Sequence, residues 1–252
     1  MLTVSFRSPL EWAFASRKLD IVRLFIEKGA RVDHVSAKGW TPAFNLFGYE
    51  WIHHKKESCI EYLQLLSAAS FSEFDIQDVD GWSAMHRAAA FGSAEDIAAL
   101  VAVGASVTLL TNLGWMPIRC AVRFENIATF LELAKHLPSS FIDQQDSRGW
   151  TLLHEAAGMG SSEMLGLVLN YGANPHAVSF KTADVVPCGL ENKAVTPGDV
   201  AKHEGEEIYL AYVEGLKLAG FDVALVQELE GGTQSSTEDI FWPAESEGGC
   251  AT

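Results

Sequence analysis

The dipeptide Gly-Trp occurs four times in this chain, each time at the start of the same short phrase. The phrases are GWTPAFNL from Gly39, GWSAMHRAA from Gly81, GWMPIRCAV from Gly114 and GWTLLHEAA from Gly149, and they align without gaps. SPLEWAFA from Ser8 and TPGDVAKH from Thr196 fit the same frame without the Gly-Trp pair. A phrase that recurs in register marks a repeated supersecondary structure, so the chain is predicted to fold as a stack of similar repeats.

Each repeat predicts two short helices joined by a turn. A hydroxyl residue stands where the first helix begins, because its side chain can accept a hydrogen bond from an N–H group that the helix leaves unpaired. A proline often follows at the first helical position, where its missing N–H costs nothing. The second helix has apolar residues at helical spacing and ends at a glycine, where a left-handed backbone is expected. The hydroxyl residues are Ser8, Thr41, Ser83, Thr151 and Thr196, the prolines are Pro9, Pro42, Pro117 and Pro197, and the glycines are Gly29, Gly104 and Gly172.

The repeats resemble the ankyrin-repeat family, whose pattern is roughly G-x-T-P-L-H-x-A-A followed by a second helix that ends in G-A. The segments GWSAMHRAAAFGSAEDIAALVAVGAS and GWTLLHEAAGMGSSEMLGLVLNYGANP match it closely. The step of about 33 residues from Ser8 to Thr41, and from Ser83 to Met116, is the ankyrin length. The resemblance covers Ser8 to Tyr212 and implies an all-α ankyrin-repeat solenoid of about six helix-turn-helix units with short β-hairpin fingers.

The repeats divide the chain into three predicted parts: an N-terminal stub at 1–7, an ankyrin-repeat domain at 8–218, and an acidic, mostly disordered tail at 219–252. A nearly complete first repeat follows the short stub, which is also consistent with a piece of a longer protein. The tail has no basic residue after Lys217, and its stretch EDIFWPAE either packs on the last repeat or serves as a motif for a partner. The repeat units lie near 8–38, 39–80, 81–113, 114–148, 149–194 and 195–218, with a long hairpin loop at Val178–Ala194.

His86 and His154 are the residues that most suggest catalysis. The family resemblance implies a structural role instead, in which each histidine bonds the hydroxyl one helical turn earlier and the backbone of the neighbouring repeat. Ser83 and Thr151 supply those hydroxyls. A catalytic array would not lose its histidine freely, so no catalytic residue and no enzyme activity are expected. The other repeats carry Glu11, Phe44, Arg119 and Asp199 at this position.

Metal and cofactor sites are not predicted. His53 and His54 precede Cys59, but adjacent histidines on a helix point in different directions, and no second cluster completes a tetrahedral set. Gly158 and Gly160 form a G-x-G, but no strand precedes them and no third glycine follows at the required spacing. The G-x-S-x-G motif is absent.

Charge and cysteine content narrow the partners and the compartment. A net charge of −15 argues against nucleic acid and against anionic membrane surfaces. The four cysteines are far apart in sequence, which favours thiols in a reducing compartment. No signal peptide or transmembrane run is evident, so an intracellular, cytoplasmic or nuclear location is expected.

The expected function is to bind a protein partner through the concave groove and the hairpin fingers. One alternative is the regulatory or substrate-recruiting part of a larger enzyme, and another is a structural scaffold. The tryptophan of each Gly-Trp pair is predicted to lie at the base of a finger on the groove side, where it either contacts the partner or packs on the next hairpin and stiffens the array. The predicted contact residues are Trp40, Trp82, Trp115 and Trp150, with Phe91, Phe124 and Met159 at the ends of the first helices.

Overall fold

The computed structural model describes residues 8–47, 59–182 and 186–232. It divides into two compact units, with the division between Ser139 and Ser140, so the repeats predicted as one domain at 8–218 are described here as unit 1 and unit 2. No helix in the described residues is both long enough and apolar enough to cross a membrane. The expectations for the stub at 1–7 and for His53 and His54 concern residues outside these ranges.

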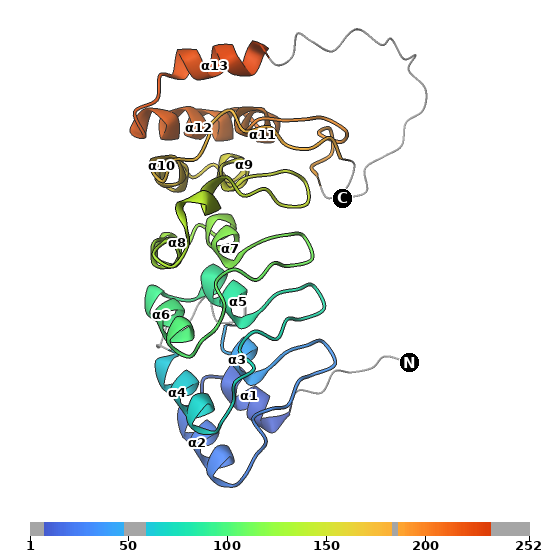
Figure 1. Cartoon of the computed structure of the whole chain (residues 1–252), viewed down its shortest axis with the longest axis vertical. Coiled ribbons are helices and arrows are strands. Elements are labelled where there is room, and N and C mark those ends of the chain that lie inside the picture. The colour runs from blue at the N-terminus through green and yellow to red at the C-terminus, as the bar shows by residue number, and fades with distance from the viewer. Residues whose placement is uncertain (1–7, 48–58, 183–185, 233–252) are drawn as a thin grey trace. The chain divides into compact units, whose positions relative to one another are not determined.

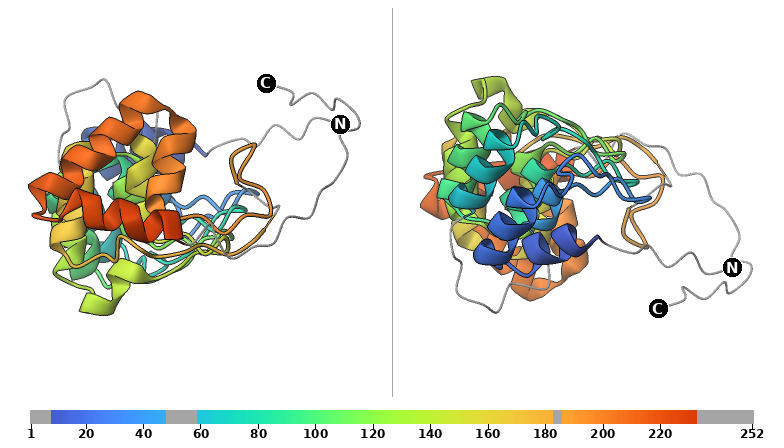
Figure 2. Two further views of the ribbon diagram at one scale, coloured as in Figure 1. Left: turned by 90° about the horizontal axis from the view of Figure 1, so that it is seen from above. Right: turned by 90° about the horizontal axis from the view of Figure 1, so that it is seen from below.

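Unit 1 contains four pairs of helices within its described residues. The first helices contact one another in series, and the second helices form a parallel series. Figure 1 shows the hairpin fingers of this unit on the side of the first helices, and Figure 2 shows them projecting together away from the helices. The first helices are α1 (Pro9–Ala15), α3 (Pro42–Asn45), α5 (Ala84–Phe91) and α7 (Pro117–Arg123), and the second are α2 (Leu19–Glu27), α4 (Ile60–Ala68), α6 (Ala94–Ala102) and α8 (Ile127–Ala134).

Unit 2 begins within a short 3-10 helix, Ser139–Asp143, and then repeats the same arrangement twice. Helix α9 (Leu152–Met159) packs on α11 (Pro197–Glu204), and α10 (Ser162–Asn170) packs on α12 (Glu206–Leu218). The described residues of the two units together contain six helix pairs, as the resemblance implied. Their cores are apolar and closely packed, with Phe14, Met85, Ile118, Phe130, Leu153, Val168 and Tyr212 nearly or fully buried.

The start of the tail differs from the prediction. The segment from 219 was expected to be mostly disordered, but α13 (Val223–Gly232) forms within it and contacts α11 and α12. The backbone turns after α12 at Gly220, which has φ 81°, and the carboxylate of Asp222 then accepts the N–H of Ala224 at 3.0 Å. Val226 is buried. An Asp cap and one buried apolar side chain therefore support a helix where acidic composition alone predicted none.

The predicted helix boundaries are confirmed at both ends. All five predicted hydroxyl residues are N-cap residues, and Ser8 forms the expected capping box with Glu11, accepting its N–H at 3.2 Å while donating its own N–H to the carboxylate at 2.7 Å. The glycines after the second helices have positive φ, with Gly104 at 89° and Gly172 at 93°. Side-chain caps and left-handed glycines thus set where these short helices begin and end.

The fingers are hairpin turns, and no β-strand forms in the described residues. In each Gly-Trp finger the residue four positions before the tryptophan closes the turn: Asp78 donates its N–H to the carbonyl of Trp82 at 2.8 Å and accepts the Trp82 N–H on its carboxylate at 2.8 Å. Ser36, Thr111 and Asp146 make the same pair of bonds with Trp40, Trp115 and Trp150. Each Gly-Trp finger is therefore closed by one backbone hydrogen bond and one side-chain hydrogen bond, in place of the ladder of backbone bonds that joins two β-strands.

The glycine of the Gly-Trp pair is favoured by its positive φ and also by the close approach of the neighbouring finger. Gly81 has φ 82°, and a Cβ placed on it would lie 2.6 Å from the backbone nitrogen of Asn112 in the next finger. That close approach accompanies a hydrogen bond from Asn112 N–H to the carbonyl of Asp80 at 3.1 Å. The dipeptide thus marks the point where one finger rests directly on its neighbour.

Candidate protein-binding surface

The hydrogen-bond geometry around His86 uses both nitrogens of its ring. Nδ1 accepts the backbone N–H of Ser83 at 3.1 Å and lies 2.9 Å from its hydroxyl, while Nε2 lies 2.9 Å from the carbonyl oxygen of Trp115. An N–H donor directed at Nδ1 requires that nitrogen to be unprotonated, so the proton is on Nε2, which donates to Trp115. Burial of the ring lowers the pKa of His86, which favours this neutral form.

His154 repeats the arrangement in unit 2. Its Nδ1 accepts the N–H of Thr151 at 3.1 Å, and its Nε2 lies 3.0 Å from the carbonyl of Val195. Both histidines are completely buried. Ser83, His86, Thr151 and His154 therefore make the bonds that the family resemblance implied, and these bonds support a structural role.

Aromatic rings form a continuous line across the first helices of unit 1. Trp40 stacks on Phe44 with ring centroids 5.8 Å apart, and the guanidinium carbon of Arg87 lies 4.7 Å from the Phe44 ring and 6.0 Å from the Phe91 ring. Phe91 meets Phe124 at 4.7 Å. We call these five residues, together with Trp82, the aromatic stripe.

Trp82 joins the aromatic stripe from the base of a finger. Its ring centroid lies 6.4 Å from that of Phe124 and 6.1 Å from that of His86, so it packs on the next repeat and on its own. Phe124 is 40% exposed, Phe44 is buried, and Trp82 is half-buried. The rings of the aromatic stripe are therefore packed against one another and only partly exposed to solvent.

The arginine of the aromatic stripe is fixed by the backbone. Arg87 donates from Nε to the carbonyl of Phe47 at 2.8 Å, which orients its planar group between the Phe44 and Phe91 rings. Lys38 extends the cationic character, with Nζ 5.2 Å from the Trp40 ring. Cations over aromatic faces are stabilised by the ring quadrupole, by about 0.5–1 kcal/mol at exposed positions. Sequence reasoning missed Arg87, although its place one residue after the family histidine is a signal for it.

Trp150 does not belong to an exposed contact surface. Its side chain is only 5% exposed and packs among Leu190, Val195 and Val200, because the long finger of unit 2 folds over it. The guanidinium carbon of Arg148 lies 4.1 Å from its ring. The prediction that Trp150 offers an exposed edge to a partner is therefore wrong, and its role is in packing.

The other predicted contact residues lie in two settings. Trp115 is half-buried, and its N–H donates to the hydroxyl of Thr111 at 3.1 Å. Met159 is half-buried at the end of α9 in unit 2. Both remain proposed contact residues.

In the part of the chain that the structure describes, no three His, Cys, Asp or Glu side chains lie close enough together to hold a metal ion. Cys59 is buried, its N–H donates to the carboxylate of Asp96 at 2.8 Å, and burial raises the pKa of its thiol to about 12. Cys59, Cys120 and Cys188 are thiols and not halves of disulfides, as predicted, while Cys250 lies outside the described residues.

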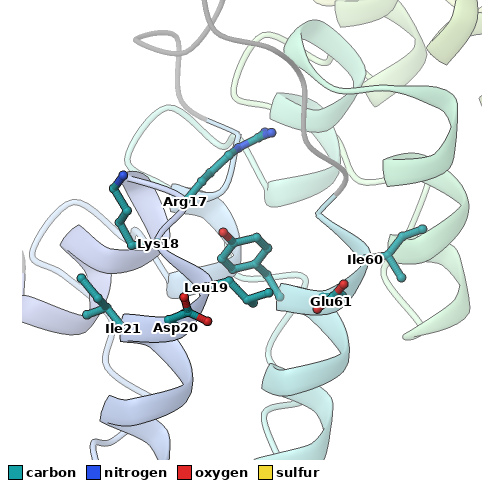
Figure 3. A pocket seen from close by; sticks show the side chains of 8 residues that line it. Arg17, Lys18, Leu19, Asp20, Ile21, Ile60 and Glu61 are labelled. Atoms are coloured by element: carbon teal, nitrogen blue, oxygen red, sulfur yellow. The ribbon is translucent and has the colours of Figure 1, made fainter.

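A pocket of about 820 Å³ lies in unit 1 beside the turn between α1 and α2 (Figure 3). Side chains of both signs surround it, including Lys18, Asp20 and Glu61. Arg17 points its guanidinium at the carbonyl of Leu46, with Nη2 3.1 Å from that oxygen. Mixed charge of this kind selects no ligand class.

Comparison with known proteins gives the same architecture. Residues 148–180 match the ankyrin repeat family. The crystal structure of the ankyrin repeat domain of Bcl-3 superimposes with a TM-score of 0.63 and 22% identity, over 87% of this chain and 89% of that one. The chain is an ankyrin-repeat protein. A chain in the structure of the Bd0816 predatory endopeptidase from Bdellovibrio bacteriovorus with immunity protein Bd3460 gives 0.62 at 17% identity, over 82% and 97% of the two chains.

Curated relatives of this ankyrin-repeat protein are much longer than the matched segments. Human ankyrin repeat and SOCS box protein 3 is 31% identical over 104 residues, which are 40% of this chain and 20% of the relative. The tyrosine-protein kinase HTK16 of Hydra vulgaris is 26% identical over 104 residues, or 41% of this chain and 14% of the kinase. The chain thus aligns with a fifth or less of each. What they share is the ankyrin fold, which is a protein-interaction fold.

Proposed function

We propose that this ankyrin-repeat protein binds a protein partner through the aromatic stripe of unit 1 and the fingers beside it. The observation that carries the proposal is the unbroken series of contacts from Trp40 through Arg87 to Phe124 and Trp82. Tryptophan and arginine are enriched among the few residues that dominate binding energy at protein interfaces. The stripe concentrates both types over three successive repeats.

Preorganisation supports the same proposal. Phe91 and Phe124 hold each other at 4.7 Å, and Arg87 is fixed by Phe47, so few rotamers would be lost when a partner binds. Each rotamer-rich side chain that is immobilised on binding costs about 0.5–1.5 kcal/mol. A surface whose side chains are already ordered avoids much of that cost.

Charge defines the partner further. The chain carries a net charge of −15, yet the aromatic stripe includes Arg87 and is flanked by Lys38. A partner segment with apolar side chains and a few carboxylates would match this local pattern, whereas the rest of an acidic surface repels acidic proteins. We therefore assign the proposed partner an apolar segment that carries acidic residues.

The alternative is that the rings of the aromatic stripe serve only to stabilise unit 1. Substitution of the more exposed stripe residues distinguishes the two roles. Phe124→Ala removes a ring that is 40% exposed, and Trp82→Ala removes one that is half-buried. Leu110→Ala is the matched control, because Leu110 is 46% exposed on a finger of the same unit but lies outside the stripe.

The experiment captures binding proteins on the wild-type chain and on the three variants, and then measures the affinity of each captured protein by titration. We expect Phe124→Ala to weaken binding by about 2 kcal/mol or more, with a small change in thermal stability, and Leu110→Ala to leave affinity unchanged. Trp115→Ala is measured in the same way. Weaker binding with a small stability change would make Trp115 a contact residue, and lower thermal stability with unchanged affinity would make it a packing residue. The proposal fails if every captured protein binds the stripe variants as tightly as the wild type.

A further inference from the structure

Described residues of the long finger of unit 2 and of helix α11 line an open pocket of about 910 Å³. Lys181 and Lys193 line it from the finger, and Lys202 and His203 line it from α11. The three lysines and the histidine are all exposed. We call this site the lysine pocket.

Cations dominate the lysine pocket. Among the described residues that line it, Asp199 carries the one carboxylate, and that group already accepts the N–H of Thr196 at 3.0 Å and its hydroxyl at 2.9 Å. Lys193 donates from its ammonium group to the carbonyl of Gly189 at 2.8 Å, and Nζ of Lys202 lies 5.1 Å from the centre of the Tyr209 ring. An anion among the three ammonium groups would lower their mutual repulsion. In a chain with a net charge of −15, such a concentration of positive charge indicates an acidic ligand.

The apolar part of the lysine pocket adds a second requirement. Val178 is 41% exposed at its edge, and the nearly buried Leu190 and Val195 form part of its floor. A simple anion would leave the side chain of Val178 in water. The ligand that satisfies both parts is a peptide segment that combines carboxylates with large apolar side chains.

One segment of this chain has that composition. Residues 238–245 read EDIFWPAE, with Glu238, Asp239 and Glu245 around Ile240, Phe241 and Trp242. We propose that EDIFWPAE binds in the lysine pocket of its own chain. Its carboxylates would meet the lysines, and its apolar side chains would meet the exposed Val178 at the edge of the pocket.

The length of the tail permits this contact. Helix α13 contacts α11, the helix that supplies Lys202 and His203, and α11 is about 12 Å long. The six residues from Gly232 to Glu238 can span about 20 Å. Covalent attachment also gives the segment an effective concentration in the millimolar range, so weak contacts suffice for occupancy.

An acidic peptide of a partner would compete with EDIFWPAE for the lysine pocket. The lysine pocket lies in unit 2 and the aromatic stripe in unit 1, so the inference stands or falls independently of the proposed function.

The test is zero-length carbodiimide crosslinking of the dilute full chain, which joins only carboxylates and amines already in contact, followed by peptide mass spectrometry. We expect Glu238, Asp239 or Glu245 to crosslink to Lys181, Lys193 or Lys202. Lys217 is the matched control, because it is exposed in the same unit but does not line the lysine pocket. Tail crosslinks that reach Lys217 as often as the pocket lysines would overturn the proposal, as would the absence of tail crosslinks.

Two further measurements test the apolar contact and the source of the segment. Phe241→Ser with Trp242→Ser keeps every charge and should reduce the pocket crosslinks to the level of Lys217, whereas an unchanged yield would mean that charge alone guides the tail. A mixture of isotope-labelled and unlabelled chains should give crosslinks within one chain. Crosslinks that join a labelled to an unlabelled peptide would assign the segment to a second copy and overturn the proposal.

Discussion

The Nε2 atom of His86 lies 2.9 Å from the carbonyl oxygen of Trp115, so a side chain in one ankyrin repeat is bonded to the backbone of the next. His154 makes the equivalent bond to Val195 in unit 2 at 3.0 Å. Each bond spans the base of a finger and holds the start of the following repeat. The histidine thus stabilises the contact between repeats as well as its own helix.

Removal of such a histidine should destabilise the fold. We expect His86→Ala to lower the free energy of unfolding by about 1–3 kcal/mol, because the hydroxyl of Ser83 and the carbonyl of Trp115 lose a buried partner. Urea denaturation measures the change. His136→Ala, at a more exposed position after α8, should stay within about 0.5 kcal/mol of the wild type. Equal losses in the two variants would contradict the bridging role.

The buried ring of His86 should also make stability depend on pH. Burial lowers its pKa below the ordinary 6.5, so the unfolded chain binds this proton more tightly than the folded one. Above about pH 8 both states are neutral at this residue and its contribution is constant. As the pH falls below 6.5, the free energy of unfolding should drop more steeply in the wild type than in His86→Gln. An NMR titration that places the His86 pKa at or above 6.5 would disprove this.

The two kinds of glycine should respond differently to alanine. Gly104 has φ 89° with nothing near its Cβ position, so Gly104→Ala should cost about 1–2 kcal/mol from backbone strain. Gly81 has φ 82° and a backbone nitrogen 2.6 Å from its Cβ position, so Gly81→Ala should cost about 1–3 kcal/mol more. Thermal unfolding of both variants gives the comparison. A smaller loss at Gly81 would show that the fingers separate easily.

Trp150 should contribute to stability in proportion to its burial. Trp150→Ala opens a cavity beside Leu190 and Val200 and should cost about 3–5 kcal/mol. Phe180→Ala, on the same finger but 52% exposed, should cost less than about 1 kcal/mol. Denaturation curves with matched slopes are the measurement, and a Trp150→Ala chain as stable as wild type would mean that the finger does not cover this ring in solution.

Thiol reactivity should separate the cysteines. The thiolate is the reactive form, and Cys59 is buried with a pKa of about 12, so it should react with a disulfide reagent only as fast as the protein opens. Cys188 is exposed and should react at once. In a Cys250→Ser background we expect one fast thiol and two slow ones, because Cys120 is also buried. A second fast thiol in the folded protein would contradict the described burial.

Local sequence patterns predicted the helix boundaries and the hydrogen bonds within a repeat, because residues close together in sequence determine both. A hydroxyl at Ser83, a histidine three residues later and a glycine at Gly104 set the helix boundaries and the bonds of one repeat, and these are confirmed. The finger-closing role of Asp78 was missed, although Ser, Asp and Thr recur four residues before each tryptophan. That signal was present in the aligned phrases.

Other features depend on contacts that no local pattern encodes. Trp150 resembles the other tryptophans in sequence, but it alone lies under the long finger that brings Leu190 over its ring. The aromatic stripe likewise depends on Arg87 reaching the carbonyl of Phe47, 40 residues earlier in the chain. Burial and exposure at these positions follow from the path of neighbouring segments.

The fingers are joined by amide side chains as well as by their backbones. Gln77 donates to the carbonyl of Gly81 in its own finger and to that of Leu110 in the next, and Gln145 does the same with Gly149 and Val178. Within each unit, neighbouring fingers are therefore mechanically coupled through a shared amide. A load placed on one fingertip is transmitted to the next, and the stiffness that a partner meets is that of the coupled fingers.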